Sequence, residues 1–184
     1  MDRMFRHKYG LTFIELLIVM LILMVVITLS LAPMRNLLYS TRVSIEISRL
    51  VTAVNLVRSE ALRRNQAVSM CPSPMALTGE PVCSGVFADG WIVFSNRDRD
   101  NKVGSKDQII RVFDALPEGY TLSNRKGTIP AQEKITYLGD GSSRQNRTLL
   151  LCAPASAGDI SKSLVMNMVG RPRLAMEWGT CPVI

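Results

Sequence analysis

Apolar residues dominate the chain directly after its first ten positions. Residues 16–32 carry no charged side chain, and Thr28 and Ser30 are the polar residues among them. Counted from Leu11 to residue 32, the run is 22 residues long and contains Glu15 as its one charged residue. At about 1.5 Å of rise per residue, this length spans the hydrocarbon core of a bilayer. The pattern therefore predicts a membrane-spanning helix over residues 11–33.

Beyond Pro33 the pattern becomes amphipathic. Apolar residues recur at helical spacing, while most charged residues fall on other faces. The apolar stripe consists of Ile47, Leu50, Val54, Val57 and Ala61. We expect this second helical part, residues 34–65, to end near Asn65 and to pack on a folded domain. Pro33 removes one backbone hydrogen bond and is expected to kink the junction.

Short β-type segments fill the rest of the chain. They are rich in β-branched, aromatic or alternating apolar residues and are separated by Gly, Pro, Asn and Asp clusters. They lie at residues 67–71, 90–94, 108–113, 134–138, 147–152, 163–169 and, less clearly, 174–178. Six or seven strands after one helix predict an α+β fold, in which the amphipathic stripe covers an antiparallel sheet in a globular head over residues 66–184.

The ten-residue leader is basic, with Arg3, Arg6 and Lys8 against Asp2. Such a flank stays on the cytoplasmic side, so the head is expected to be exported. A conventional signal peptide is the alternative, but it has its small-residue cleavage site after the apolar core. Here Gly10 precedes that core. Cleavage after residues 1–10 leaves the apolar helix on the mature protein.

Four cysteines in an exported domain indicate two disulfide bonds. Three pairings are possible, and the spacing favours Cys71 with Cys83 and Cys152 with Cys181 without deciding between them. A zinc site is the alternative. It is disfavoured because there is no C-x-x-C pair and the single histidine, His7, lies in the leader.

Glu15 requires an explanation because a carboxylate in apolar surroundings costs several kcal/mol without a partner. The stretch GLTFIELLIVMLIL, residues 10–23, resembles the N-terminus of type IV prepilins and type II secretion pseudopilins. The resemblance implies cleavage after Gly10 by a prepilin peptidase and N-methylation of Leu11, where phenylalanine is the more common residue. It also implies that Glu15, the fifth mature residue, pairs with the N-terminal ammonium of a neighbouring pilin during assembly.

The later segments resemble the FimT/GspH class of minor pilins and pseudopilins, in order and over nearly the whole chain. The matching stretches are RSEALRRNQAVSMC, GWIVF, ITYLGDG, RTLLLC and SLVMNMVGRPRL. This resemblance implies the type IV pilin-like fold, with its long helix packed on one or more antiparallel sheets. It implies a single-pass protein of the bacterial inner membrane with its head in the periplasm, which reaches the cell surface in a pilus. A GspH-like pseudopilin or priming minor pilin with a structural role is the alternative function.

FimT-like minor pilins of transformable bacteria have a G-R-x-R motif, which here is Gly170, Arg171, Pro172 and Arg173. The resemblance implies binding of extracellular DNA. Extended backbone would point the two arginines to one side, about 6 to 7 Å apart, and their planar guanidinium groups suit phosphate oxygens. Gly170 permits a tight turn or a close approach before them. The alternative is a charged, solvated edge strand.

Charge supports the DNA hypothesis only modestly. The chain has a net charge of +7, and without the leader 19 basic residues face 14 acidic ones. From residue 144 onward the excess is larger, because only Asp159 and Glu177 are acidic. The basic residues of that region are Arg144, Arg147, Lys162, Arg171 and Arg173. No base-reading motif is present, so we expect weak, salt-dependent contacts to the backbone of double-stranded DNA.

Other chemistry finds little support in the sequence. Asp98 and Asp100 could suggest calcium, but the glycine and terminal glutamate of an EF-hand loop are missing, so a solvated turn is expected. After the leader there is no histidine, and the chain contains no G-x-S-x-G, P-loop or H-E-x-x-H motif. The sequence predicts a binding and assembly protein with no enzymatic activity, no metal and no cofactor.

Overall fold

A single helix, α1 (Phe13–Arg64), opens the described part of the chain. The structure is a computed structural model that describes residues 12–100, 102–143, 145–176 and 178–181, without the side chains of residues 29–33. The chain divides into two units, residues 1–38 and 39–184. The helix assignment continues through Pro33 without interruption, and the helix ends at Arg64, next to the predicted Asn65.

The second half of α1 buries the predicted apolar stripe. Each of the five stripe residues is at most 2% exposed in the unit formed by residues 39–184. The helix stops where Asn65 takes a φ of +48°, a left-handed conformation that ends a helix. The helical periodicity of the sequence therefore identified the packed face correctly.

The first sheet, sheet A, has four antiparallel strands in the order β3-β2-β1-β5. Its strands are β1 (Val68–Pro72), β2 (Trp91–Ser95), β3 (Ile109–Phe113) and β5 (Ile135–Tyr137). Strands β1 and β2 are fully buried, as their near-continuous apolar sequences indicate. Strand β3 is an edge of the sheet and has exposed positions.

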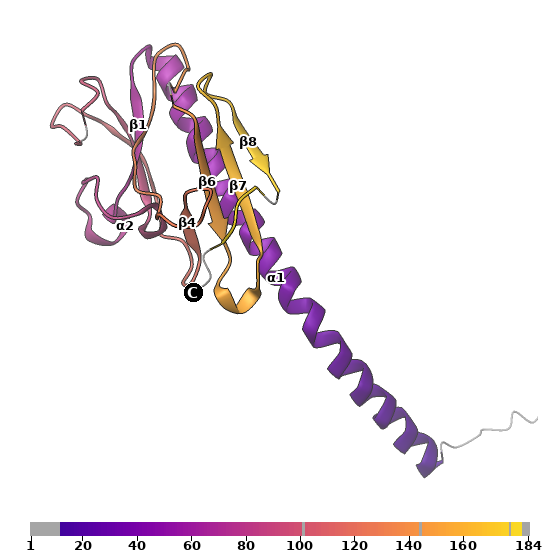
Figure 1. Cartoon of the computed structure of the whole chain (residues 1–184). Helices are drawn as coiled ribbons and strands as arrows, with labels where there is room; N and C mark the ends of the chain where they lie inside the picture. The colour runs from indigo at the N-terminus through magenta and orange to yellow at the C-terminus, as the bar shows by residue number, and fades with distance from the viewer. Residues whose placement is uncertain (1–11, 101, 144, 177, 182–184) are drawn as a thin grey trace, which may run out of the picture. The chain divides into compact units, whose positions relative to one another are not determined.

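The second sheet, sheet B, has four antiparallel strands in the order β4-β6-β7-β8. Its strands are β4 (Thr121–Ser123), β6 (Arg147–Cys152), β7 (Ser161–Met166) and β8 (Pro172–Ala175). Strands β4 and β8 form its two edges (Figure 1). Short helical turns are α2 (Met75–Thr78), η1 (Phe87–Asp89) and η2 (Ala155–Ala157).

The two sheets share one hydrophobic core with the second half of α1, which runs alongside β6 and β7 (Figure 1). In sheet B the core-facing residues include Leu149 of β6 and Leu164 of β7. Because side chains alternate along a strand, Thr148 and Val165 point to the opposite side, which we call the outer face of sheet B. This face carries the site described below.

The structure confirms the pilin-like α+β arrangement and completes or changes three details of the strand prediction. The number of sheets, which the fold prediction left open, is two, because strand pairing is decided by contacts remote in sequence. Strand β4 was missed, since its three residues, Thr121–Ser123, include one apolar residue between two small polar ones and form no apolar or β-branched run. The predicted strands at 163–169 and 174–178 begin two residues earlier and end three residues earlier, as β7 and β8. Strand β7 ends at Met166 because Asn167 and Gly170 form the turn that leads to β8.

Two disulfide bonds join the cysteines in the favoured pairing. Cys71 is bonded to Cys83, and Cys152 to Cys181. The second bond fixes the C-terminal segment, residues 178–181, to the end of β6. It thereby holds that segment on the outer face of sheet B.

Candidate functional site

The N-terminal motif lies partly outside the described residues, which exclude Gly10 and Leu11. The cleavage and methylation site therefore stays a prediction. Within the described chain, the Thr12 amide donates to Glu15 Oε2 at 3.5 Å and the Glu15 amide donates to Thr12 Oγ1 at 3.3 Å. This reciprocal pair is a capping box at the start of α1. The T-x-x-E spacing in the sequence is its signature, and it gives Glu15 a local role beside the predicted assembly role.

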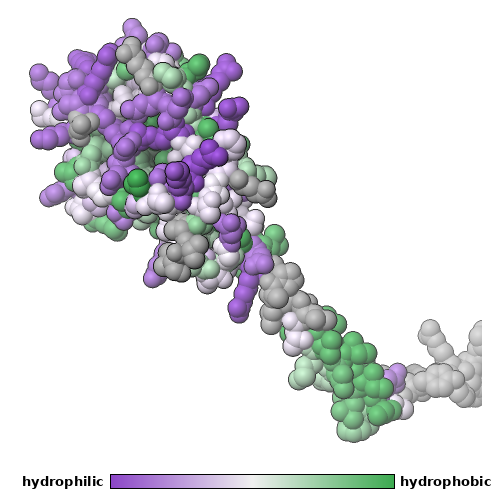
Figure 2. All heavy atoms as spheres, viewed as in Figure 1, coloured by the Kyte–Doolittle hydropathy of each residue, from purple (hydrophilic) through white to green (hydrophobic). Residues whose placement is uncertain are grey.

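The first half of α1 exposes an apolar surface. Every large apolar side chain from Phe13 to Ile27 is at least 48% exposed, and Figure 2 shows this part of the helix as hydrophobic. A surface of this kind indicates an interaction with lipid or with other proteins. Among the described residues, no helix combines the length and apolar character that a membrane crossing requires. The membrane segment over residues 11–33 stays a prediction.

The turn before β8 explains Gly170. Its φ is +79°, and a Cβ there would collide with the carbonyl oxygen of Gly141 and lie 2.6 Å from Cε1 of Tyr137. The Tyr137 hydroxyl donates to the Gly170 carbonyl oxygen at 3.1 Å, and burial raises the pKa of this hydroxyl. Gly170 is itself buried, so its part in the motif is to shape the turn that presents the arginines.

Arg171 and Arg173 are both exposed next to this turn. The Arg171 amide donates to Asn167 Oδ1 at 3.0 Å, which fixes the backbone just before β8. Arg173 lies opposite Val165 on β7, so its side chain belongs to the outer face of sheet B. Within the described chain, neither guanidinium group has a hydrogen-bond or ion-pair partner. Both charges are therefore available to an anionic ligand.

The other predicted basic residues do not join this pair. Arg147 donates to Glu133 Oε2 at 2.6 Å and also to its carbonyl oxygen. Burial lowers the pKa of Arg147, and Glu133 opposes that shift. Lys162 donates to Ser44 Oγ of α1 at 2.8 Å and points to the core side of sheet B, as its partner Leu151 does. Arg144 lies outside the described residues.

A second basic site, which the sequence analysis did not identify, occupies the other side of the outer face. Arg125 and Lys126 are exposed in the turn that follows β4. The Arg125 guanidinium carbon lies 4.3 Å from the ring centroid of Trp178 in the C-terminal segment. The Ser163 hydroxyl donates to the Trp178 carbonyl oxygen, and the Thr180 amide donates to that of Arg125. More than 50 residues separate Arg125 from Trp178, so no local sequence signal announces this contact.

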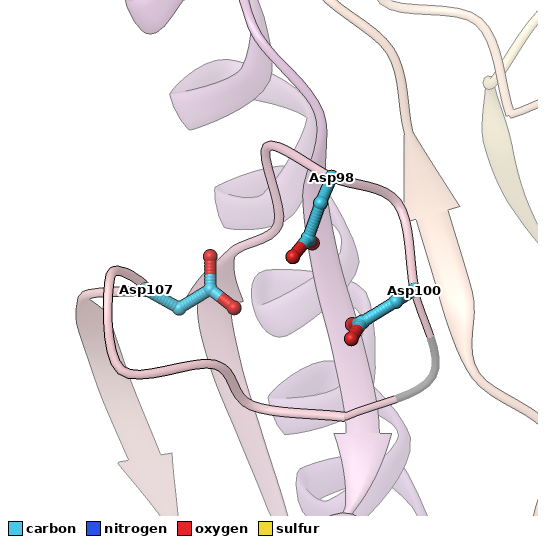
Figure 3. A group of neighbouring side chains, drawn as sticks. All are labelled: Asp98, Asp100 and Asp107. Atoms are coloured by element: carbon cyan, nitrogen blue, oxygen red, sulfur yellow. The ribbon is translucent and has the colours of Figure 1, made fainter.

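Three aspartates gather in the loop between β2 and β3 (Figure 3). Carboxylate oxygens of Asp98, Asp100 and Asp107 lie within 4.8 Å of one another. Asp107 accepts a hydrogen bond from the Gly104 amide, and the Lys134 ammonium contacts the Asp100 carbonyl oxygen. Burial lowers the pKa of Lys134, while all three aspartates act to raise it. Lys134 therefore compensates part of the negative charge of this loop, and Asp107 is the member that the sequence pattern did not indicate.

Comparisons with known protein families agree with the pilin-like fold described above. The family model described as type II transport protein GspH matches residues 46–170, and the prokaryotic N-terminal methylation motif matches residues 5–31. A search of curated protein sequences finds no significant match.

Two solved structures share the fold. The type IV minor pilin FimU of Pseudomonas aeruginosa is 17% identical, with a TM-score of 0.50 over 74% of this chain and 90% of FimU. The minor pseudopilin EpsH from the type 2 secretion system of Vibrio cholerae is 16% identical, with a TM-score of 0.50 over 73% of this chain and 96% of EpsH. At these identities the likeness concerns the fold alone.

Proposed function

The chain belongs to the GspH family of type II transport proteins, and from this premise we propose that it is a minor pilin of a type IV pilus that binds extracellular DNA for uptake. Type IV minor pilin or GspH-like pseudopilin is the class that the family match and the N-terminal methylation motif establish. Proteins of this class are structural components of filaments. The proposal adds the pilus, the DNA and the residues that hold it.

The assembly part of the proposal starts from the N-terminus. The methylation motif indicates a membrane-anchored, pilus-associated protein. We assign cleavage to the bond between Gly10 and Leu11, methylation to Leu11, and a single pass through the inner membrane to residues 11–33. Before assembly the folded unit is periplasmic. In the filament, the exposed apolar side chains of α1 pack on those of other pilins, and Glu15 pairs with a neighbouring N-terminus.

The DNA part rests on one observation: Arg171 and Arg173 are exposed at an edge strand, and among the described residues their guanidinium groups have no ion-pair or hydrogen-bond partner. Two arginines separated by one residue can contact successive phosphates of one DNA strand. Their contacts carry no sequence information, so binding is non-specific and weakens as salt rises. A few such contacts give a Kd on the order of micromolar or weaker.

A mobility-shift titration of the full-length chain in mild detergent tests this site. We expect the double variant Arg171→Gln, Arg173→Gln to lower DNA affinity by about tenfold. The slope of log affinity against log salt concentration should become shallower by an amount that corresponds to about two phosphate contacts. Arg111→Gln is the matched control, because Arg111 is exposed on β3, the corresponding edge of sheet A. Equal affinities of the double variant and the control would refute the assigned site.

The second candidate function is that of a secretion pseudopilin or a priming minor pilin without DNA binding. The description of the matching family model as a type II transport protein favours it. Deletion of the gene separates the two candidates. A loss of pili or of secretion, with DNA uptake reduced only in proportion, supports the structural role. DNA uptake that is lost in the two-arginine variant while filaments persist supports the DNA-binding role.

A further inference from the structure

The outer face of sheet B forms a shallow strip between two basic sites. Thr148 of β6, Val165 of β7 and Arg173 of β8 stand in register across it. Thr148 and Val165 are only partly buried, whereas their neighbours Leu150 and Ser163 are fully buried. Gly179 of the C-terminal segment lies against Leu150, so that segment covers one part of the face and leaves the strip open.

Arg125 borders the strip on the side away from Arg173, and its position is fixed. Its guanidinium group stacks on Trp178, and its carbonyl oxygen accepts a hydrogen bond from Thr180. The Cys152–Cys181 bond anchors the same segment. An arginine held by an aromatic ring loses little additional side-chain freedom on binding an anion, while its N–H groups stay available to solvent.

The separation of the two basic sites matches a duplex better than a single strand. Arg125 follows β4 and Arg173 lies on β8, at opposite edges of a four-stranded sheet. At about 4.8 Å per strand spacing, the three spacings from β4 to β8 place the backbones of the two sites about 14 Å apart. Grooves of B-DNA are about 6 to 12 Å wide, so the two sites can reach the phosphate chains on either side of one groove.

The charge of sheet B also favours contact with the phosphate chains of a duplex. The four strands of sheet B contain no acidic residue, and Lys126 adds a second positive charge beside Arg125. Resting on the proposed DNA-binding function, we propose that Arg125 and Lys126 form a second phosphate site that contacts the strand opposite the one held by Arg171 and Arg173. The surface thereby favours double-stranded over single-stranded DNA.

Fluorescence anisotropy with two labelled probes tests the second site. The probes are a 30-base-pair duplex of mixed sequence and one of its strands alone, with the full-length chain in mild detergent. We expect Arg125→Gln combined with Lys126→Gln to raise the duplex Kd by about three- to tenfold and the single-strand Kd by less than about twofold. The slope of log duplex affinity against log salt concentration should become shallower by an amount that corresponds to about two phosphate contacts.

Two further variants separate charge from structure. Arg125→Lys keeps the charge but loses the planar stacking group, so we expect a smaller loss of duplex affinity than in the Arg125 and Lys126 double variant. Arg111→Gln again serves as the control for the loss of one exposed charge. Thermal unfolding of each variant checks that the C-terminal segment stays in place.

The outcomes distinguish this inference from the function on which it rests. If the Arg171 and Arg173 variant loses affinity for both probes while the Arg125 and Lys126 variant equals the control, the second site is refuted and DNA binding stands. An equal loss for both probes in the Arg125 and Lys126 variant also refutes the duplex preference. If neither variant differs from the control, the DNA-binding function itself fails.

Discussion

The apolar side chains of the two halves of α1 differ in their exposure to solvent. Between Val43 and Ala61 the apolar stripe is buried against two sheets of the same chain. Between Phe13 and Ile27 the apolar side chains surround the helix and remain exposed. The second half is buried by intramolecular packing, whereas the first half exposes an apolar surface of the kind that contacts lipid or other proteins. The helix therefore combines a half that packs in the core of residues 39–184 with a half whose apolar side chains stay exposed.

The largest expected effect contrasts one valine from each half. Val54→Asp places a carboxylate without a partner in the core, because Val54 is 0% exposed, and should destabilise the folded unit by about 3 to 5 kcal/mol. Val19→Asp should change that stability by less than about 0.5 kcal/mol, since Val19 makes no part of the core. Its expected effect is poor membrane insertion and filament incorporation. Denaturant unfolding, followed by circular dichroism in detergent, measures the first effect, and membrane fractionation the second. Equal destabilisation by both variants would contradict the contrast.

Glu15 in the first half of α1 and Glu46 in the second half provide a second, smaller contrast. Glu46 is buried, accepts a hydrogen bond from Arg49 at 2.6 Å and forms an ion pair with Arg42 at 3.3 Å. Glu46→Gln leaves these arginines without their counter-charge and should cost about 1 to 3 kcal/mol of stability. Glu15→Gln keeps part of the helix cap and should leave the folded unit unchanged while it blocks filament assembly. The same unfolding curves and a filament preparation test both expectations, and a destabilised folded unit in the Glu15 variant would oppose them.

The smallest expected effect concerns pH at the end of the packed half. Hydrogen bonds from Arg63 and Arg64 lower the pKa of Glu60 from 4.5 to about 2. Because the folded-state pKa is lowered, the contribution of Glu60 to stability is complete above about pH 4.5 and is lost as the pH falls toward 2. Glu60→Gln should remove this part of the acid sensitivity and cost well under about 1 kcal/mol at pH 7, as surface ion pairs do. Unfolding curves at pH 7 and 3 measure the difference, and an unchanged pH dependence would contradict it.

Local patterns in the sequence were sufficient for much of the fold. The stripe from Ile47 to Ala61 follows from the 3.6-residue period alone, and six of the eight strands coincide with apolar, β-branched runs. Both disulfide bonds join cysteines close in sequence, as their spacing favoured. The division into two sheets was not predictable in this way, because β5 pairs with β1 across more than 60 residues. Pairing at that distance depends on the whole arrangement of the chain.

In the candidate site, too, local sequence determined some features and long-range contacts determined the others. The sequence by itself determined that Arg171 and Arg173 stand next to a glycine turn, because Gly170 marks the turn and the two arginines follow it directly. Only the tertiary structure decided which other charges join them. It engages Arg147 with Glu133 and Lys162 with Ser44, and it brings Arg125 to Trp178 on the outer face of sheet B. A charge is free or engaged according to neighbours that folding brings together, and those neighbours are far away along the chain.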